Sequence, residues 1–195
     1  MLSINRIFLT GVSCVGKTTI GSKLAGLLGY RFYDLDAEVE TFYGISIEHL
    51  QKRFKSMTGF RNAAAIVLEH IISNTEGHHC VVVLPPRGLM NPYWNVVRAA
   101  KAITVVIQDK PENILRRIMF YDIDSHPIKM VLSETQRRFY LQDIAEDIIY
   151  FRRSYQKATM VVDISGLNAE DSACKIKSEL GANLKKKGEN IGPFL

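Results

Sequence analysis

Residues 5–19 read Asn-Arg-Ile-Phe-Leu-Thr-Gly-Val-Ser-Cys-Val-Gly-Lys-Thr-Thr, an apolar stretch that runs into a glycine-rich turn. The turn matches the phosphate-loop pattern Gly-x-x-x-x-Gly-Lys-Thr over residues 11–18, between an expected strand and an expected helix. In this pattern successive backbone N–H groups and the helix N-terminus cradle phosphate oxygens. The alternative, a strand–helix turn that binds nothing, is disfavoured because the motif and both flanks agree. The sequence therefore predicts a nucleotide site here.

Each residue type in this turn has a physical task. Gly11 and Gly16 allow the backbone to curl tightly. Lys17 supplies an ammonium for the β- and γ-phosphates, and the hydroxyl of Thr18 is a ligand for Mg²⁺. We therefore expect ATP and Mg²⁺ as cofactors and Lys17 as a catalytic residue. The expected nucleotide-binding residues of the loop are Gly11, Val12, Ser13, Cys14, Val15, Gly16, Lys17, Thr18 and Thr19.

Composition narrows the class of protein. The chain has 195 residues, of which 47% are hydrophobic and 23% charged, as in an ordinary globular domain. No apolar run approaches the roughly 20 residues of a membrane span, and the N-terminus lacks the pattern of a secretory signal. The three cysteines show no metal-binding spacing, which suits a reducing cytoplasm. Cys14 is either a small residue that fills the loop or a redox-sensitive thiol.

The net charge of +5 is modest and partly lies in the lysine run 185–187. We expect a single domain over residues 1–182 and a flexible basic tail over 183–195, which leaves open a weak role as a partner-binding arm. Without that tail the charge is nearly balanced, and no aromatic–basic pattern indicates a nucleic-acid partner. We expect a monomer that binds neither nucleic acid nor membrane.

Apolar and helical segments alternate along the whole chain. This order predicts an α/β fold with a parallel sheet covered on both faces, whose ligands bind beyond the carboxyl ends of the strands. The expected strands are 7–10, 31–34, 80–84, 103–107 and 160–164. The expected helices are 18–28, 36–42, 46–54, 59–73, 96–101, 111–119, 134–157 and 169–180, the last ending at Gly181, with an irregular segment at 120–133.

Two carboxylates follow the second expected strand, at Asp34 and Asp36. At the carboxyl end of a strand beside the phosphate loop, Asp34 would hold the Mg²⁺ shell through water. Asp36 would accept a hydrogen bond from a substrate hydroxyl and help to remove its proton. The simpler alternative is that Asp36 only caps the following helix, since Asp is a favoured N-cap.

Several motifs together resemble those of shikimate kinases over roughly the first 70 residues. They are Ile-Phe-Leu-Thr-Gly-x4-Gly-Lys-Thr-Thr-Ile-Gly at 7–21, Leu-Gly-Tyr-x-Phe-Tyr-Asp-x-Asp at 28–36, Gly-Ile-Ser-Ile at 44–47 and Phe-Arg at 60–61. The resemblance implies a three-layer phosphate-loop fold with strand order 2-3-1-4-5, substrate-binding helices at about 36–73 and a lid at about 120–133. It also implies ATP-dependent phosphorylation of a ring hydroxyl in aromatic amino acid biosynthesis.

The resemblance also implies roles for individual residues. Asp36 would contact the substrate hydroxyl, Arg61 the substrate carboxylate and Arg117 the adenine ring. Arg61 suits its role because a planar guanidinium matches a carboxylate with two hydrogen bonds, although a surface arginine is the simpler alternative. Gly88 is the only match to a Gly-Gly-Gly turn that approaches the substrate, and Arg152 is the best match to a further substrate arginine.

Other positions depart from the pattern of the family. Ala64 stands where the family has a substrate-contacting Glu, and Pro85-Pro86-Arg87 replaces most of the glycine turn. Two prolines remove backbone donors, and Arg87 adds bulk and charge. His126 stands near the place of the lid arginine, for which Arg137 and Arg138 are substitutes to consider.

The nucleotide half thus matches the family, whereas the acceptor half differs. Three hypotheses follow: a kinase that acts on shikimate through altered contacts, a kinase of the same fold for another small anionic acceptor such as a sugar acid, and a nucleotide-binding regulatory protein that has lost transfer. The complete phosphate loop with Asp34 and Asp36 favours the two kinases.

Overall fold

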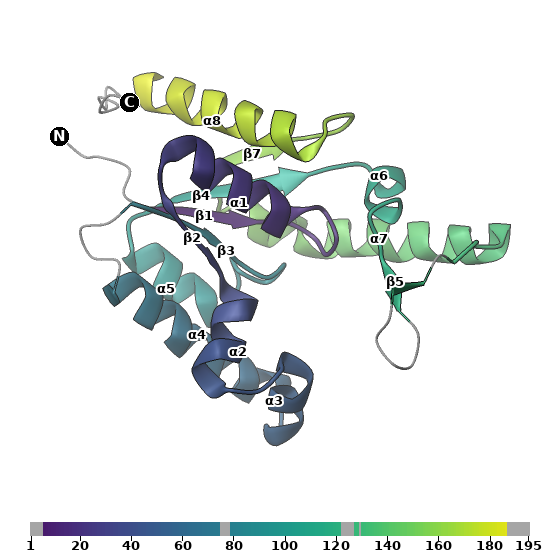
Figure 1. The fold of residues 1–195 in the computed structure, drawn as a ribbon, viewed down its shortest axis with the longest axis horizontal. Helices are drawn as coiled ribbons and strands as arrows, with labels where there is room; N and C mark the ends of the chain where they lie inside the picture. The colour runs from purple at the N-terminus through teal and green to yellow at the C-terminus, as the bar shows by residue number, and fades with distance from the viewer. Residues whose placement is uncertain (1–5, 75–78, 122–126, 129, 187–195) are drawn as a thin grey trace.

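The computed structural model describes residues 6–74, 79–121, 127–128 and 130–186, and its centre is a parallel five-stranded sheet (Figure 1). The strands lie in the order β2-β3-β1-β4-β7, which confirms the expected order 2-3-1-4-5. All four pairings within this sheet are parallel. The strands are β1 (Arg6–Thr10), β2 (Arg31–Asp34), β3 (Cys80–Val83), β4 (Ile103–Gln108) and β7 (Met160–Asp163).

The central strands are apolar because helices cover both of their faces. Phe8 of β1 pairs with Val82 of β3 on one side and Thr104 of β4 on the other, and all of these side chains are buried. The helices are α1 (Lys17–Leu28), α2 (Leu35–Tyr43), α3 (Ile47–Arg53), α4 (Met57–Asn74), α5 (Tyr93–Ala99), α6 (Pro111–Leu115), α7 (Glu134–Tyr155) and α8 (Ala169–Lys186). In the described residues, none of them has the length and apolar composition needed to span a bilayer.

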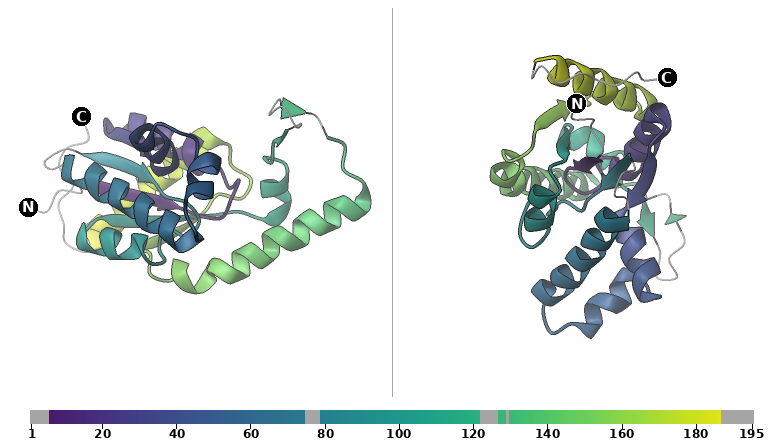
Figure 2. Two further views of the ribbon diagram at one scale, coloured as in Figure 1. Left: turned by 90° about the horizontal axis from the view of Figure 1, so that it is seen from below. Right: turned by 90° about the vertical axis from the view of Figure 1, so that its left-hand side faces the viewer.

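Helices cover both faces of the sheet, and others extend beyond it. Helices α1 and α8 lie together on one face of the sheet, and α4 and α5 lie on the other (Figures 1 and 2). Helix α7 extends well beyond the sheet, and Figure 2 shows α6 beside its middle turns and a small hairpin that projects beyond α6. This hairpin pairs β5 (Phe120–Tyr121) with β6 (Pro127–Ile128) in antiparallel fashion. Helices α2 and α3 project near the β2 edge.

Four expected segments differ from the structure, one of which is α6, which ends at Leu115 rather than at residue 119. Helix α8 does not end before Gly181 but continues to Lys186. A glycine within a helix costs only about 1 kcal/mol relative to alanine, so it does not by itself end the helix. Helix α5 begins at Tyr93, and the segment expected to be irregular contains the hairpin. His126 of the expected lid and residues 187–195 of the expected tail lie outside the described residues.

The packing of α1 on the sheet depends on a glycine. A Cβ at Gly21 would lie 2.6 Å from Cγ2 of Val83 in β3 and 3.2 Å from the ring of Phe32 in β2. A Cβ at Gly26, five residues later in the same helix, would meet no atom within 4 Å. Because Val83 is itself buried, it has little room to move. Gly21 therefore sets the distance between α1 and the sheet.

We expect Gly21→Ala and Gly26→Ala to change the free energy of unfolding in different ways. Gly26→Ala should stabilise the protein by about 0.5–1 kcal/mol, because alanine is the better helix former. Gly21→Ala gains the same propensity but overpacks the interface, at a cost of about 1–3 kcal/mol. Urea denaturation of both variants gives the difference, and equal stabilities would contradict the close packing at Gly21.

Candidate functional site

The phosphate loop curls as its sequence predicts, and its two glycines are required for different reasons. Gly16 has a φ of 103°, in the left-handed region that side chains disfavour. A Cβ at Gly11 would lie 2.6 Å from the carbonyl oxygen of Ile107 in β4, so only glycine fits against this strand. The loop therefore turns sharply out of β1 and directs its backbone towards the N-terminus of α1.

Lys17, the first residue of α1, holds its ammonium over the loop. Its Nζ donates to the carbonyl oxygen of Val12 at 2.9 Å. Burial lowers the pKa of Lys17 from 10.5 to about 8, although the nearby Asp36, Cys14 and Asp34 each raise it in part. The side chain is thus charged at pH 7 and poorly hydrated, which strengthens its attraction for a polyphosphate.

Thr18 and Asp34 present two hard oxygen ligands at one point. The Thr18 hydroxyl donates to Oδ2 of Asp34 at 2.6 Å, across from the C-terminal end of β2. Such oxygens fit Mg²⁺, which is bound in similar sites by one or two protein groups together with substrate phosphates. Within the described residues there is no cluster of three or more His, Cys, Asp or Glu that would hold a metal by itself. The residues present therefore fit a metal that arrives with a nucleotide.

A cavity of about 500 Å³ opens beside the loop, here called the phosphate-loop cavity. It is lined by residues of the loop and of α1, by Arg117 after α6, and by residues that lead into α8, including Leu167 and Asn168. Arg117 is held there by an ion pair with the buried Asp109, at 2.6 Å from Nη1 to Oδ2. Burial alone would raise the pKa of Asp109, but hydrogen bonds from Asn113 and Arg117 lower it overall.

A second cavity of about 270 Å³ lies on the other side of the loop, here called the Asp36 cavity. Helices α2, α3, α4, α5 and α7 and the turn after β3 contribute to it. Its apolar wall includes Phe60, Met57 and Phe151. Its polar and charged residues are Ser13, Asp36, Gln51, Arg61, Arg87, Tyr93 and Asp147. The structure thus brings Asp36 and Arg61 into one cavity beside the phosphate loop.

The surroundings of Asp36 favour a carboxyl group that accepts protons more readily than usual. Burial raises its pKa, and the Asp34 carboxylate raises it further, while Lys17 opposes them. Asp36 is nevertheless partly open to solvent. Asp34 rather than Asp36 caps α2, because Oδ1 of Asp34 accepts from the backbone N–H of Asp36 at 3.1 Å. The carboxylate of Asp36 is therefore left for another partner.

Tyr93 of α5 is buried and lines the same cavity. Burial and Asp36 raise the pKa of its hydroxyl to about 12, and Arg61 lowers it in part. The phenol thus remains a neutral hydrogen-bond donor over the physiological range, next to a carboxylate and a guanidinium.

Three positions that the family motifs single out, Ala64, Gly88 and Arg152, are not among the residues that line the Asp36 cavity. Ala64 is buried within α4, at 2% exposure, and packs in the core. Gly88 is also buried, and its N–H donates to the carbonyl of Pro85 at 2.8 Å. Arg152 lines a separate cavity of about 370 Å³ with Val12, Asp109 and Tyr155. The sequence motifs alone do not distinguish these three positions from Asp36 and Arg61, which line the Asp36 cavity.

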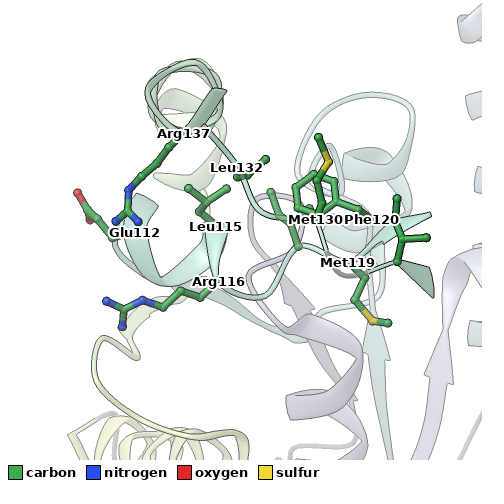
Figure 3. A pocket seen from close by; sticks show the side chains of 10 residues that line it. Glu112, Leu115, Arg116, Met119, Phe120, Met130, Leu132 and Arg137 are labelled. Atoms are coloured by element: carbon green, nitrogen blue, oxygen red, sulfur yellow. The ribbon is translucent and has the colours of Figure 1, made fainter. Parts of the chain in front are cut away.

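Another hollow, about 710 Å³, lies away from the phosphate loop, between α6, the hairpin and the start of α7. In Figure 3, Met119, Phe120 and Met130 gather on one side of it, and Arg137 of α7 extends towards Glu112 of α6 on the other. Arg116 also lines this hollow, whereas its neighbour Arg117 lines the phosphate-loop cavity.

Comparison with known proteins agrees with this geometry. A family model described as "SKI: Shikimate kinase" matches residues 13–181. The chain belongs to the shikimate kinase family. A shikimate kinase from Chlorobaculum parvum is 32% identical over 80% of this chain and 81% of that protein. One from Caldanaerobacter subterraneus is 28% identical over 95% of this chain and 99% of that protein. The family is one of ATP-dependent kinases.

The fold comparison leads to the same family. The solved structure of the shikimate kinase from Acinetobacter baumannii in complex with shikimate superposes with a TM-score of 0.69. It is 25% identical, and the match covers 92% of this chain and 94% of that one. The family, the strand order and the phosphate-loop class that the sequence motifs predict are thereby confirmed.

Some cavity residues could not be found from the sequence. Leu167 and Asn168 follow the last strand without any motif, and only the fold carries them next to Thr18. Asp147 and Phe151 belong to a long helix of mostly polar and charged residues, where nothing distinguishes them from a solvated face. Their one signal is helical spacing, since residues four apart lie on the same face.

The lowered pKa of Lys17 predicts how affinity for magnesium-loaded ATP depends on pH. The free lysine loses its proton near pH 8, whereas bound phosphates favour the charged form. The affinity should thus be constant below that pH and fall above it, by up to about tenfold per pH unit. Calorimetry between pH 7 and 10 measures this dependence.

Two variants of α1 test the assignment. Lys17→Met should bind weakly and lose the pH dependence, while Lys23→Met, which removes an exposed lysine paired with Glu170, should keep it. The same slope in Lys17→Met as in the wild type would rule out Lys17 as its source.

Proposed function

We propose that this protein transfers the γ-phosphoryl group of ATP to a hydroxyl of a small anionic metabolite bound in the Asp36 cavity. The observation that carries the proposal is the placement of Asp36 and Arg61 in one small cavity that also contains Ser13 of the phosphate loop. An acceptor in this cavity would lie directly against a nucleotide bound by the same loop.

The residues divide the work of in-line transfer. Lys17 and the backbone N–H groups of the loop would bind the β- and γ-phosphates and offset the charge that develops on them. Thr18 and Asp34 would hold Mg²⁺, which supplies further charge stabilisation on the same oxygens when it is bound. Asp36 would accept a hydrogen bond from the attacking hydroxyl and orient it. Arg117 would contact the base of the nucleotide, since it lines the phosphate-loop cavity.

Shikimate is the first acceptor to test, because the relatives are named shikimate kinases. Arg61 would bind its carboxylate, and the lining residues Tyr93 and Gln51 would donate to or accept from its hydroxyls. The cavity also supports a second candidate, another hydroxylated acid such as a sugar acid. This alternative is favoured by Arg87, whose side chain occupies the cavity at the position of the glycine turn of the family.

We expect Asp36→Asn to lower acceptor-dependent ADP release by about 10²–10⁴-fold, because the amide cannot take the proton. The variant should still bind ATP at pH 7, where Lys17 remains charged. Glu38→Gln, on the same helix but outside the cavity, is the matched control and should retain activity. Full activity in Asp36→Asn would remove the carboxylate from the mechanism.

ADP release should be measured with shikimate, gluconate, nucleoside monophosphates and no acceptor. Stimulation by an acid identifies the acceptor class, whereas ATP binding without stimulation by any acceptor would contradict the transfer proposal and favour a regulatory protein. In the same assay Arg61→Met should raise the KM of the acid by a factor that corresponds to about 1.5–3 kcal/mol, the free energy of a hydrogen bond to a charged group. An unchanged KM would exclude Arg61 from the acceptor site.

A further inference from the structure

The turn after β3 carries an arginine into the Asp36 cavity. Arg87 lines this cavity together with Asp36 and Arg61, whereas Arg152 lines the neighbouring one. The difference follows from the geometry of α7, because consecutive helical residues point about 100° apart. Phe151 faces the Asp36 cavity, so Arg152, the next residue, faces away from it. The two guanidiniums of the Asp36 cavity therefore come from α4 and from the turn.

The backbone of this turn is firmly held. The carbonyl of Pro85 accepts from the Thr10 hydroxyl and from the Gly88 N–H, both at 2.8 Å. The carbonyl of Pro86 accepts from the Tyr155 hydroxyl at 3.1 Å. The two proline rings fix their own φ angles, which further limits motion of the turn. Pro85 and Pro86 thus remove two backbone N–H donors from the turn, but they also hold the backbone that carries Arg87 in a fixed position.

Helix α7 holds the guanidinium itself. Nη2 of Arg87 donates to the Tyr150 hydroxyl, and Nη1 contacts the sulfur of Met90 at 3.7 Å. The guanidinium carbon lies 5.2 Å from the centre of the Tyr150 ring and 5.9 Å from that of Phe151, distances at which a cation is attracted to an aromatic face. The side chain therefore has a defined position on the wall of the cavity.

Its charge is not neutralised by direct contact. Among the described residues, neither Arg61 nor Arg87 has a carboxylate oxygen within 4.0 Å. Asp147 lines the same cavity, and Arg87 lowers the pKa of its carboxyl in part, against burial and Asp143, which raise it. The guanidinium of Arg87 donates to the Tyr150 hydroxyl and to the sulfur of Met90, which leaves some of its five N–H donors for a ligand. Two cations in a cavity of about 270 Å³ attract an anion that is small enough to reach both.

We propose that Arg87 is a specificity-determining residue that binds the acid group of the acceptor together with Arg61. The inference rests on the proposed function and names its substrate class: a small hydroxylated carboxylic acid, with its carboxylate between the two guanidiniums and one hydroxyl towards Asp36. In this arrangement the turn supplies the cation that the family motifs assign to α7 at Arg152.

The test compares acids with neutral molecules of the same shape. Calorimetry in the presence of a non-hydrolysable ATP analogue gives dissociation constants for shikimate and its methyl ester, and for gluconate and glucitol. The wild type should bind at least one acid about tenfold or more tightly than its neutral partner, as expected for a charged hydrogen bond. Arg87→Met should lower this ratio by about tenfold while leaving affinity for the nucleotide unchanged.

Three further variants separate direct binding from a structural role. Arg87→Lys should restore part of the preference for the acid, since it keeps the charge but loses the planar fork. Tyr150→Phe should have a smaller effect than Arg87→Met, because it removes only the hydrogen bond that positions the guanidinium. Arg98→Met is the matched control, since it removes an exposed arginine of α5 that lies outside the cavity.

Two results would overturn the proposal: an acid-to-neutral ratio that is unchanged in Arg87→Met, or a greater loss of that ratio in Arg152→Met. Failure of every acid to bind the wild type more tightly than its neutral partner would overturn it as well. These outcomes differ from failure of the proposed function, which appears as the absence of acceptor-stimulated ADP release. A kinase specific for neutral acceptors would retain that release while disproving the role of Arg87.

Discussion

The parallel pairing of β1 with β3 and β4 at once is the constraint on which the site depends. Leu9 pairs with Val83 on one side and Val105 on the other, so all three strands end at the same edge of the sheet. The phosphate loop, the turn after β3 and Asp109 after β4 therefore meet there. The backbone N–H of Leu84 donates to the carbonyl of Leu9 at 2.8 Å, which extends this ladder to the base of the turn.

One consequence is that the phosphate loop separates three cavities. Val12 lines the cavity that contains Arg152, Ser13 lines the Asp36 cavity and Cys14 lines the phosphate-loop cavity. Three consecutive residues thus face three different spaces, because the loop is too tightly curled for their side chains to share a direction. A nucleotide on one side of the loop and an acceptor on the other would be within reach of the same backbone.

Charge is arranged around the loop with little direct neutralisation. Burial lowers the pKa of Lys17, while burial and Asp34 raise that of Asp36. Each change weakens the charged form of one group, yet Lys17 and Asp36 support each other's charge. The same low hydration that causes these changes strengthens the attraction of Lys17 for phosphate. The partial burial of the loop therefore both destabilises the charged form of Lys17 and strengthens its attraction for phosphate.

Helix α7 connects the Asp36 cavity with the region of the hairpin. Its last turns provide Phe151 to the Asp36 cavity and the Tyr155 hydroxyl to the turn after β3. Its first turns lie beyond the sheet near the hairpin, where Arg137 lines the hollow of about 710 Å³. The family motif predicts Arg152 of this helix as a substrate-binding arginine. However, a shift of one residue along a helix rotates the direction of the side chain by about 100°. Helical phase, which the motif does not contain, determines which cavity an arginine enters.

The sequence by itself determined the phosphate loop, the alternation of strands and helices and the family, because local geometry requires Gly11 and Gly16 and because both-sided burial requires apolar strands. It also predicted Asp36 and Arg61 as site residues, because they lie at the ends of recognisable motifs, and the two line one cavity. Only the tertiary structure placed Arg87, Tyr93 and Asp147 in one cavity, because their meeting depends on packing between segments that are far apart in the chain. Such contacts leave no pattern in a single sequence, since each residue follows only the periodicity of its own helix or turn.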